Sequence, residues 1–382
     1  MRARSLIATS VVALLAACST TPSPTNPAAT HLETPTAAPT GASPTIVAPT
    51  PSSAAKVILP FLGHTATLLR DGRVLVAGGV TDWDAYAPIA TAELYDPATS
   101  QWTPTGTMLG PRSGHVAVLL ADGRVLVAGG DATRAGDGLA TADLYDPTTG
   151  SWSSTGAMAA GQSWLAAVRL ASGDVLEVSQ NHAEVYDATT GAWKAIRPNA
   201  DRGNFSTLTV LADGRVLLAG GGQREGCAVA DAELYDPARR TWTVTGRMLD
   251  GHAGQAAGLL ANGLALVAGG GCESGTTAEQ YDPVSGTWDA SGSMLVAGGD
   301  FTTTSLFDGR VLVLGGSAGA SDRLAYAEMS DPLGSAWTAL PNMEVARAAH
   351  TATLLRSGLV LVVGGDAVGS TASTELFDPE AR

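Results

Sequence analysis

Three of the six histidines, His64, His115 and His350, occupy one recurring position in the sequence, and imidazole is a common metal ligand. In four other stretches the same position holds Leu165, Ser206, Gln255 and Phe301. A position that accepts Leu and Phe is typical of packing. We therefore predict no metal site and no other cofactor. The alternative, a metal held by the three histidines, requires their stretches to be neighbours in space.

A carboxylate also recurs, close to a tyrosine or its substitute. The members are Glu93, Asp143, Glu184, Glu233, Glu279, Glu328 and Glu375. Catalytic acids must lie together, so one acid in every unit argues against an acid–base pair. We expect these carboxylates to accept hydrogen bonds from backbone amides or from the arginine of a recurring Asp-Gly-Arg sequence, and we expect the tyrosines to be buried.

Three cysteines are present. Cys227 and Cys272 each follow a glycine-rich stretch in adjacent units, so their loops should lie side by side. In an exported protein they would meet an oxidising compartment, and we predict a disulfide between them. Two free thiols are the alternative.

These residues are set in a unit that occurs seven times. Each unit has a glycine between two apolar runs: Gly72, Gly123, Gly173, Gly214, Gly263, Gly309 and Gly358. In six units a Gly-Gly pair follows six residues later. Repeats of roughly 40 to 50 residues are typical of propeller blades.

The second unit shows how one repeat should fold. Residues 115–120 favour a strand, Asp122-Gly123 favours a hairpin turn, and residues 124–128 are apolar throughout, as expected of a strand covered on both faces. A third strand is expected over residues 142–145, and a fourth from Trp152 to Met158. The unit is thus four short antiparallel strands.

The Gly-Gly pair, the Glu-Leu-Tyr-Asp-Pro string and the following tryptophan together resemble a kelch repeat. The resemblance covers nearly all of residues 57–382 and implies an all-β fold, a seven-bladed β-propeller with four-stranded antiparallel blades. The seventh unit stops after Phe377-Asp378-Pro379, so we expect a segment around Ala55 to Leu59 to supply its outer strand.

The Asp-Gly-Arg-Val-Leu strings further resemble the propeller domain of galactose oxidase. That resemblance raises copper-dependent oxidation, which in that family uses two Tyr, two His and a thioether-linked Cys–Tyr pair. No tyrosine stands next to a histidine here, and the cysteines have no candidate Tyr outside the repeated string. The sequence therefore supports the fold and not the copper site, and it predicts no catalytic residue.

Binding residues are expected where the repeat is broken. Aromatic and charged candidates in the loops are Trp83, Tyr86, Trp164, Arg224 and Tyr326. Arg112 and Arg347 match the arginine that often precedes the first strand in kelch units. The competing interpretation of all seven is ordinary loop decoration.

The N-terminus has a basic start, an apolar run and small residues ending at Cys18, which resembles the lipobox of bacterial lipoproteins. We expect residues 1–17 to be a signal peptide and Cys18 to carry lipid. An ordinary secretory leader is the alternative. Residues 18–56 are rich in Pro, Thr, Ala and Ser and are expected to form a disordered tether.

The net charge of −14 and the scattered basic residues disfavour a nucleic-acid partner. The sequence predicts a monomeric, non-catalytic scaffold that binds a protein or a glycan at the bacterial envelope, outside the cytoplasm and anchored to the membrane by lipid. Two alternatives stay open. One is a carbohydrate-active propeller enzyme, such as an oxidase, mutarotase or lyase, and the other is a structural adhesion module.

Overall fold

The computed structural model describes residues 62–81, 86–136, 138–180, 182–198, 203–222, 228–270, 275–318, 322–366 and 373–381. Several sequence-based predictions fall outside these ranges and stay predictions. They concern the leader and Cys18, the tether, the closing segment around residues 55–59, the Cys227–Cys272 disulfide, and the side chains of Trp83 and Arg224.

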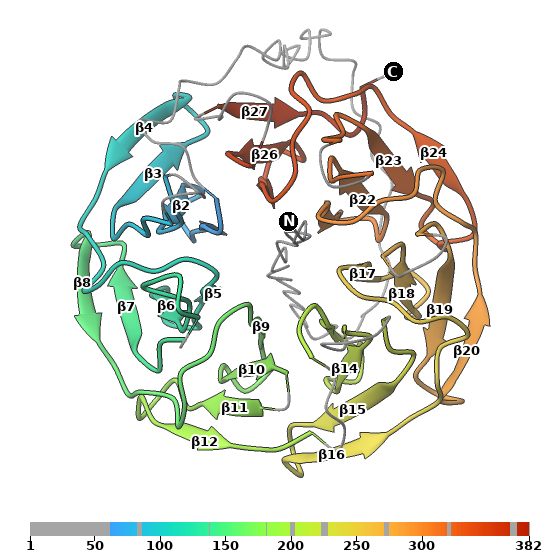
Figure 1. Cartoon of the computed structure of the whole chain (residues 1–382), viewed down its shortest axis with the longest axis horizontal. Coiled ribbons are helices and arrows are strands. Elements are labelled where there is room, and N and C mark those ends of the chain that lie inside the picture. Colours follow the sequence, from blue (N-terminus) through green and yellow to red (C-terminus); the bar gives the residue numbers. More distant parts are fainter. Residues whose placement is uncertain are drawn as a thin grey trace, which may run out of the picture.

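The described residues form seven antiparallel sheets arranged around a central axis (Figure 1). Blade 1 contains β1 (Thr65–Leu68), β2 (Val74–Ala77), β3 (Ala92–Asp96) and β4 (Gln101–Pro104). Blade 2 contains β5 (Val116–Leu119), β6 (Val125–Ala128), β7 (Ala142–Asp146) and β8 (Ser151–Ser154). Blade 3 contains β9 (Ala166–Arg169), β10 (Val175–Ser179), β11 (His182–Tyr186) and β12 (Trp193–Ala195). Blade 4 contains β13 (Thr207–Val210), β14 (Val216–Ala219), β15 (Ala232–Asp236) and β16 (Thr241–Val244).

The remaining blades follow the same order, and the last has three described strands. Blade 5 contains β17 (Ala256–Leu259), β18 (Ala265–Ala268), β19 (Ala278–Asp282) and β20 (Thr287–Ala290). Blade 6 contains β21 (Thr302–Ser305), β22 (Val311–Leu314), β23 (Ala327–Ser330) and β24 (Trp337–Ala339). Blade 7 contains β25 (Thr351–Leu354), β26 (Val360–Val363) and β27 (Thr374–Phe377). The predicted seven-bladed propeller is confirmed.

Each blade buries its second strand on both faces, because neighbouring blades cover it on either side. In blade 2, Val125 and Val127 of β6 pack towards blade 1, whereas Leu126 packs towards blade 3. The apolar run of this strand follows from that burial. The cores therefore lie between the blades, as seven apolar layers around the ring.

The recurring Tyr and Trp join successive blades. The rings of Tyr145 and Trp152 lie 5.0 Å apart in blade 2. The Tyr145 hydroxyl bonds Thr105 Oγ1 of the preceding segment at 2.8 Å, and Trp152 Nε1 donates to the Gly106 carbonyl at 2.7 Å. Tyr145 is buried in the layer shared with blade 1, so the predicted burial of these tyrosines is confirmed.

One glycine of each Gly-Gly pair is required by close backbone contact. Gly78 has φ of 67°, and a β-carbon there would lie 2.6 Å from the Arg112 carbonyl oxygen. No other residue fits this combination of positive φ and contact. The Gly-Gly pair thus ends the second strand where the next blade's incoming link passes.

The ring closes where blade 7 meets blade 1. Val74 and Val76 of β2 pack against Leu361 and Val363 of β26 in one apolar cluster. His64 Nε2 also bonds Thr351 Oγ1 at 2.9 Å across the same junction. Packing between described strands therefore joins the two ends of the repeat region.

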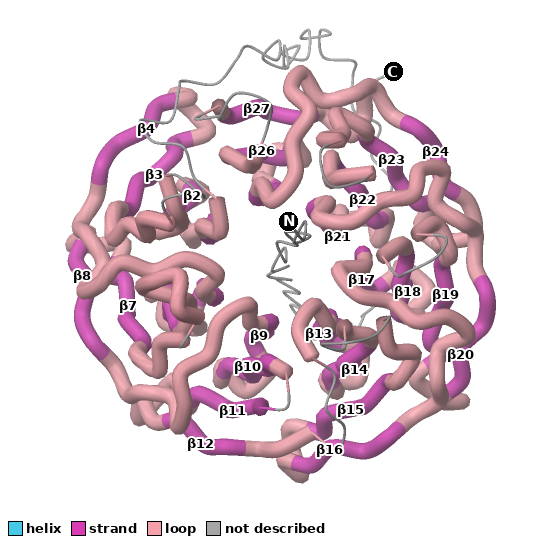
Figure 2. Tube along the Cα trace, in the orientation of Figure 1, coloured by secondary structure: helices cyan, strands magenta, loops and turns pink. Residues whose placement is uncertain are grey.

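Strand direction gives the disc two unlike faces. The turn face carries the tight hairpin turns, between the first and second strands and between the third and fourth. The loop face carries the long connections between the second and third strands and the links between blades. Figure 2 shows the strands of each blade joined by loops and turns. No helix of the described residues has the length and apolarity needed to cross a bilayer.

Candidate functional site

The described aromatic candidates all lie on the loop face. Tyr86 belongs to the β2–β3 connection, Trp164 to the link between β8 and β9, and Tyr326 to the β22–β23 connection. Arg112 and Arg347 belong to links on this same face. The topology therefore gathers these residues on one side of the disc, although they come from different blades.

Arg112 and Arg347 are buried within the loop face and not presented on it. Arg112 is 1% exposed, and its guanidinium donates to the Gly129 carbonyl at 2.9 Å and pairs with Asp143 at 3.1 Å. Arg347 is 0% exposed and donates to the Gly364 carbonyl at 2.8 Å. Both guanidiniums fasten a link to the next blade, so we leave them out of the candidate binding surface.

A ring of left-handed residues marks the inner edge of the loop face. In each blade, the residue two positions before the first strand has a positive φ between 56° and 72°. The ring consists of Gly63, Gly114, Trp164, Phe205, Gly254, Asp300 and Ala349. Backbone hydrogen bonds join several neighbouring members, because Gly114 N donates to the Gly63 carbonyl at 2.8 Å and Trp164 N to the Gly114 carbonyl at 2.9 Å.

Two members of this ring are neighbouring aromatics. Trp164 in blade 3 and Phe205 in blade 4 are both half-buried, and each occupies a conformation that costs a non-glycine residue about 1–2 kcal/mol. The Trp164 indole lies over Gly114 of blade 2, where a β-carbon would be 3.1 Å from its Cδ2. Large rings therefore stand at strained positions that glycine fills elsewhere.

Sequence reasoning found Trp164 but missed Phe205 and Asp300. The signal was available, because all three replace the glycine that precedes the recurring His position by one residue. Trp164 stands out in the sequence because a large aromatic residue replaces the glycine that other units have at Gly63, Gly114 and Gly254. Phe205 and Asp300 look ordinary until the repeat shows that their backbone needs a left-handed conformation.

Tyr86 forms a second polar and aromatic group on the loop face. Its hydroxyl donates to Asp131 Oδ2 of blade 2 at 3.5 Å, and the Arg134 guanidinium carbon lies 5.8 Å from its ring centre. Burial and the nearby Asp131 charge raise the pKa of Tyr86 to about 12. The phenol therefore stays protonated and acts as a hydrogen-bond donor. Tyr326 is also half-buried, and burial raises the pKa of its hydroxyl.

The comparisons agree with this architecture. The Kelch motif family model matches residues 64–109, which cover blade 1 and the start of the following link. A fungal alcohol oxidase of the AA5 family, solved in complex with copper, superposes with a TM-score of 0.69 at 17% identity, covering 86% of this chain and 76% of that one. The structure of YjhT gives a TM-score of 0.56 at 16% identity, covering 76% of this chain and all of the other. The chain is a kelch-repeat β-propeller. None of the curated proteins matches it significantly.

At these identities the two structures share the fold with this kelch propeller. Its own side chains decide what each recurring polar residue does. The three histidines are packing groups, as predicted: His115 Nε2 bonds Thr65 Oγ1 at 3.0 Å, and His350 Nε2 bonds Thr302 Oγ1 at 2.8 Å. Burial and a nearby arginine hold the pKa of both side chains well below the usual value. No metal-binding group of His, Cys, Asp or Glu occurs within the described ranges.

The recurring carboxylates of the kelch units accept backbone hydrogen bonds, as predicted. Glu184 accepts from Ala159 N at 2.9 Å, and Glu279 accepts from Leu249 N at 2.6 Å. These two carboxylates thus hold the links that arrive from the preceding blades. The Asp-Gly-Arg arginines instead pair within their own turns, as Arg73 does with Asp71 at 2.7 Å.

Glu177 is a buried strand acid that the repeat does not explain. The other blades place Val76, Val127, Leu218, Val267, Val313 and Val362 at this position. Glu177 is 0% exposed and lies directly across from Glu184, and neither of its carboxylate oxygens has a hydrogen-bond partner. Burial, reinforced by Glu184, raises its pKa well above the usual value. The raised pKa favours the protonated, neutral form of the Glu177 carboxyl group, which is buried between blades 2 and 3.

Proposed function

We propose that this propeller is a non-catalytic binding module that takes a glycan on the inner edge of its loop face, with Trp164 and Phe205 as the contact residues. The observation that carries the proposal is the placement of two neighbouring aromatics at left-handed positions. Strained backbone conformations cluster at functional sites. Nothing in the local fold requires a ring there, because glycine serves in blades 1, 2 and 5.

The chemistry of the inner edge fits a sugar ligand. Half-buried Trp and Phe rings offer flat apolar surfaces for stacking, and buried Asp300 belongs to the same ring of residues. Large aromatic side chains on rigid backbone contribute strongly to binding because they lose little conformational freedom. The hydrogen bonds between successive links hold this backbone in place.

The wider setting that we propose is the outside of a bacterial cell. The lipobox-like sequence ending at Cys18 and the following Pro- and Thr-rich segment support a lipid-anchored protein held on a tether. A glycan of the cell envelope is then the ligand within reach. A monomer suffices, because one chain supplies the whole ring.

The test is a screen of the purified protein against envelope polysaccharides, followed by glycine substitutions that keep the backbone conformation. Trp164→Gly and Phe205→Gly should each weaken binding about tenfold or more, which is the effect of removing a central aromatic contact. Ala349→Gly is the matched control at an equivalent position and should bind normally. Unchanged affinity in both aromatic variants would refute the proposal.

The second candidate is a carbohydrate-active enzyme, because one similar structure is an alcohol oxidase in complex with copper. Metal analysis of the purified protein separates the two. Stoichiometric copper, or turnover of a sugar that is lost in Trp164→Gly, would show that the protein is an enzyme and would refute the non-catalytic binding module. A protein that binds sugar without copper or turnover supports the binding module.

A further inference from the structure

Three arginines lie near the axis on the turn face, opposite the proposed glycan site. Arg70 follows β1, Arg356 follows β25, and Arg169 is the last residue of β9. Arg70 and Arg356 are exposed, whereas Arg169 is half-buried. Within the described ranges none of the three forms an ion pair with a carboxylate. We call this group the inner arginine cluster.

Two members of the inner arginine cluster converge on one turn of blade 2. The Arg169 guanidinium donates to the Leu119 carbonyl at 3.3 Å, and the Arg70 guanidinium donates to the Ala121 carbonyl. Burial and the Arg70 charge lower the pKa of Arg169. The guanidiniums of Arg70 in blade 1 and Arg169 in blade 3 therefore both approach the β5–β6 turn, where their hydrogen-bond acceptors are backbone carbonyl groups.

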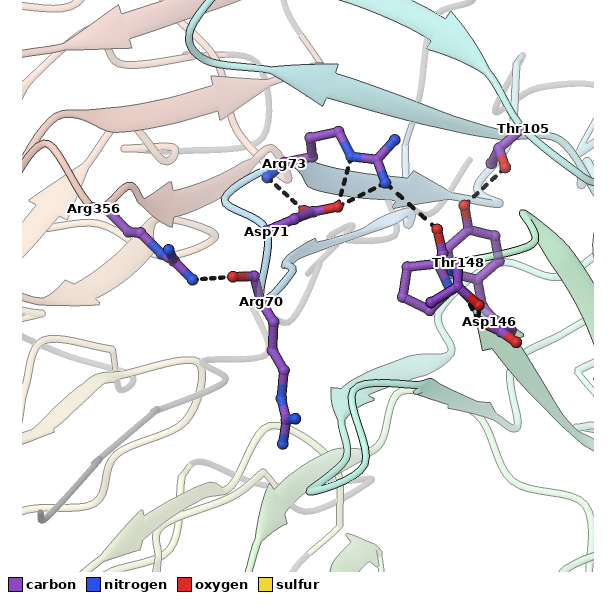
Figure 3. A network of polar contacts seen from close by, with 9 residues as sticks. Arg70, Asp71, Arg73, Thr105, Asp146, Thr148 and Arg356 are labelled. Atoms are coloured by element: carbon purple, nitrogen blue, oxygen red, sulfur yellow. Dashed lines mark hydrogen bonds and ion pairs between the residues drawn. The ribbon is translucent and has the colours of Figure 1, made fainter.

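The nearby acids do not neutralise this charge. Asp71 pairs with Arg73 at 2.7 Å, and Asp122 pairs with Arg124 at 2.7 Å, each within its own turn. Asp174, in the corresponding turn of blade 3, accepts from Ser172 Oγ at 3.1 Å. Figure 3 shows Arg70 extending away from the Asp71–Arg73 pair, while Arg356 donates to the Arg70 carbonyl. The cluster is thus positive in a chain of net charge −14.

An exposed aromatic residue continues the same edge. Phe307 occupies in blade 6 the turn position that Arg356 occupies in blade 7 and Arg70 in blade 1. Its side chain is 75% exposed. Blade 6 lies beside blade 7, and blade 7 beside blade 1 (Figure 1), with β21 in contact with β25 and β25 with β1. The turns that carry Phe307, Arg356 and Arg70 are therefore neighbours around the axis.

We propose that the inner arginine cluster and Phe307 bind an acidic polysaccharide. Guanidinium groups pair with carboxylates through charge-assisted hydrogen bonds, and the exposed ring offers a stacking surface for a sugar. Several separated cations call for a ligand that carries several negative charges. Arg169 ends β9 two residues before the turn position that corresponds to Arg70, so its backbone lies about 7 Å deeper along the strand. A polysaccharide chain reaches such a recessed group, whereas the flat surface of a membrane does not.

The experiment measures binding of oligogalacturonate to the full chain by calorimetry, with neutral galacto-oligosaccharide as the comparison. The wild type should bind only the acidic oligomer, with an affinity that falls as salt rises. Arg70→Gln and Arg169→Gln should each weaken binding about tenfold, the effect of losing one charge-assisted contact. Arg215→Gln is the matched control, since Arg215 lies on the same face but pairs with Asp213 at 2.7 Å in the turn of blade 4, outside the cluster, and this variant should bind normally.

Two further arms keep the outcome decisive. Trp164→Gly alters the opposite face and should leave oligogalacturonate binding unchanged, so failure of one proposal is distinguishable from failure of the other. Vesicles containing phosphatidylglycerol should bind weakly or not at all. Equal binding of neutral and acidic oligomers, no effect of Arg70→Gln and Arg169→Gln, or arginine-dependent binding to the vesicles would overturn the proposal.

Discussion

At the scale of single residues, side chains that resemble catalytic groups are mostly occupied by the fold. His115 bonds a threonine of the neighbouring blade, and Glu279 accepts from two backbone amides of an incoming link. These partners explain why the same residue types recur around the ring. Glu177 is different, because its buried carboxyl group faces another acid and lacks a hydrogen-bond partner.

Replacing Glu177 should stabilise the protein at neutral pH. Glu177→Leu places the side chain that blade 4 already has at this position, and it removes an unsatisfied buried group that costs about 1–3 kcal/mol. The raised pKa means that the folded state binds the carboxyl proton more tightly than the unfolded chain does. Wild-type stability is therefore lost as pH rises above the unfolded pKa of about 4.3.

Urea unfolding of wild type and Glu177→Leu at several pH values tests this expectation. The stabilising effect of the substitution should be largest at neutral and alkaline pH and should shrink towards about pH 3, well below the unfolded pKa, where the carboxyl group is protonated in both states. A benefit that is constant with pH, or a loss of stability at neutral pH, would contradict a buried neutral acid.

At the scale of elements, the links between blades carry the candidate site because their backbone conformation is constrained. The positive-φ residues allow neighbouring links to bond through their backbones, as Gly254 N donates to the Phe205 carbonyl at 3.0 Å. Glycine adopts this conformation with the least steric strain, so each non-glycine residue in the ring lowers the free energy of unfolding.

The backbone strain can be measured at Ala349, because replacing alanine by glycine does not also remove an aromatic ring. Ala349→Gly should raise the free energy of unfolding by up to about 1 kcal/mol, because it relieves the left-handed strain at φ 56°. The adjacent Ala348→Gly is the matched control. Ala348 is buried and has no positive φ, so its replacement should lower stability by about 0.5–1 kcal/mol. Chemical denaturation of both variants gives the comparison, and equal shifts would argue against strain at the ring.

At the scale of the whole molecule, stability depends on the junctions that complete the circle. Blade 7 has three described strands, and its last strand supplies Phe377 to a cluster shared with Leu312 and Leu314 of blade 6. Val360 joins the same cluster from β26. The final strand therefore connects the end of the repeat region to the blade before it.

Phe377→Ala should destabilise the molecule by about 3–5 kcal/mol, the usual cost of truncating a buried phenylalanine. Phe377 is 5% exposed, whereas Phe307 is 75% exposed. The same substitution at Phe307 should change stability by no more than about 0.5 kcal/mol. Thermal and urea unfolding of the two variants measure the difference. Similar stabilities would mean that the seventh blade contributes little to the closed ring.

Much of the fold was predictable because each blade is specified by local patterns that recur. The Asp-Gly turns, the apolar second strands and the Tyr–Trp pairs are visible in any single unit, and repetition makes them unambiguous. The roles of the recurring His and Glu residues were predictable for the same reason. A position that recurs in every blade, or tolerates very different side chains, serves the architecture.

The sequence by itself determined the blade, the number of repeats and the residues that stand outside the pattern. Only the tertiary structure decided that Arg112 and Arg347 are buried, that Phe205 joins Trp164 at strained positions, and that Arg70 meets Arg169 over a turn of blade 2. The physical reason is that a blade folds through contacts between nearby residues, whereas a binding edge is assembled from several blades. Which side chains meet there depends on the closed circle, and that geometry is not encoded in any one repeat.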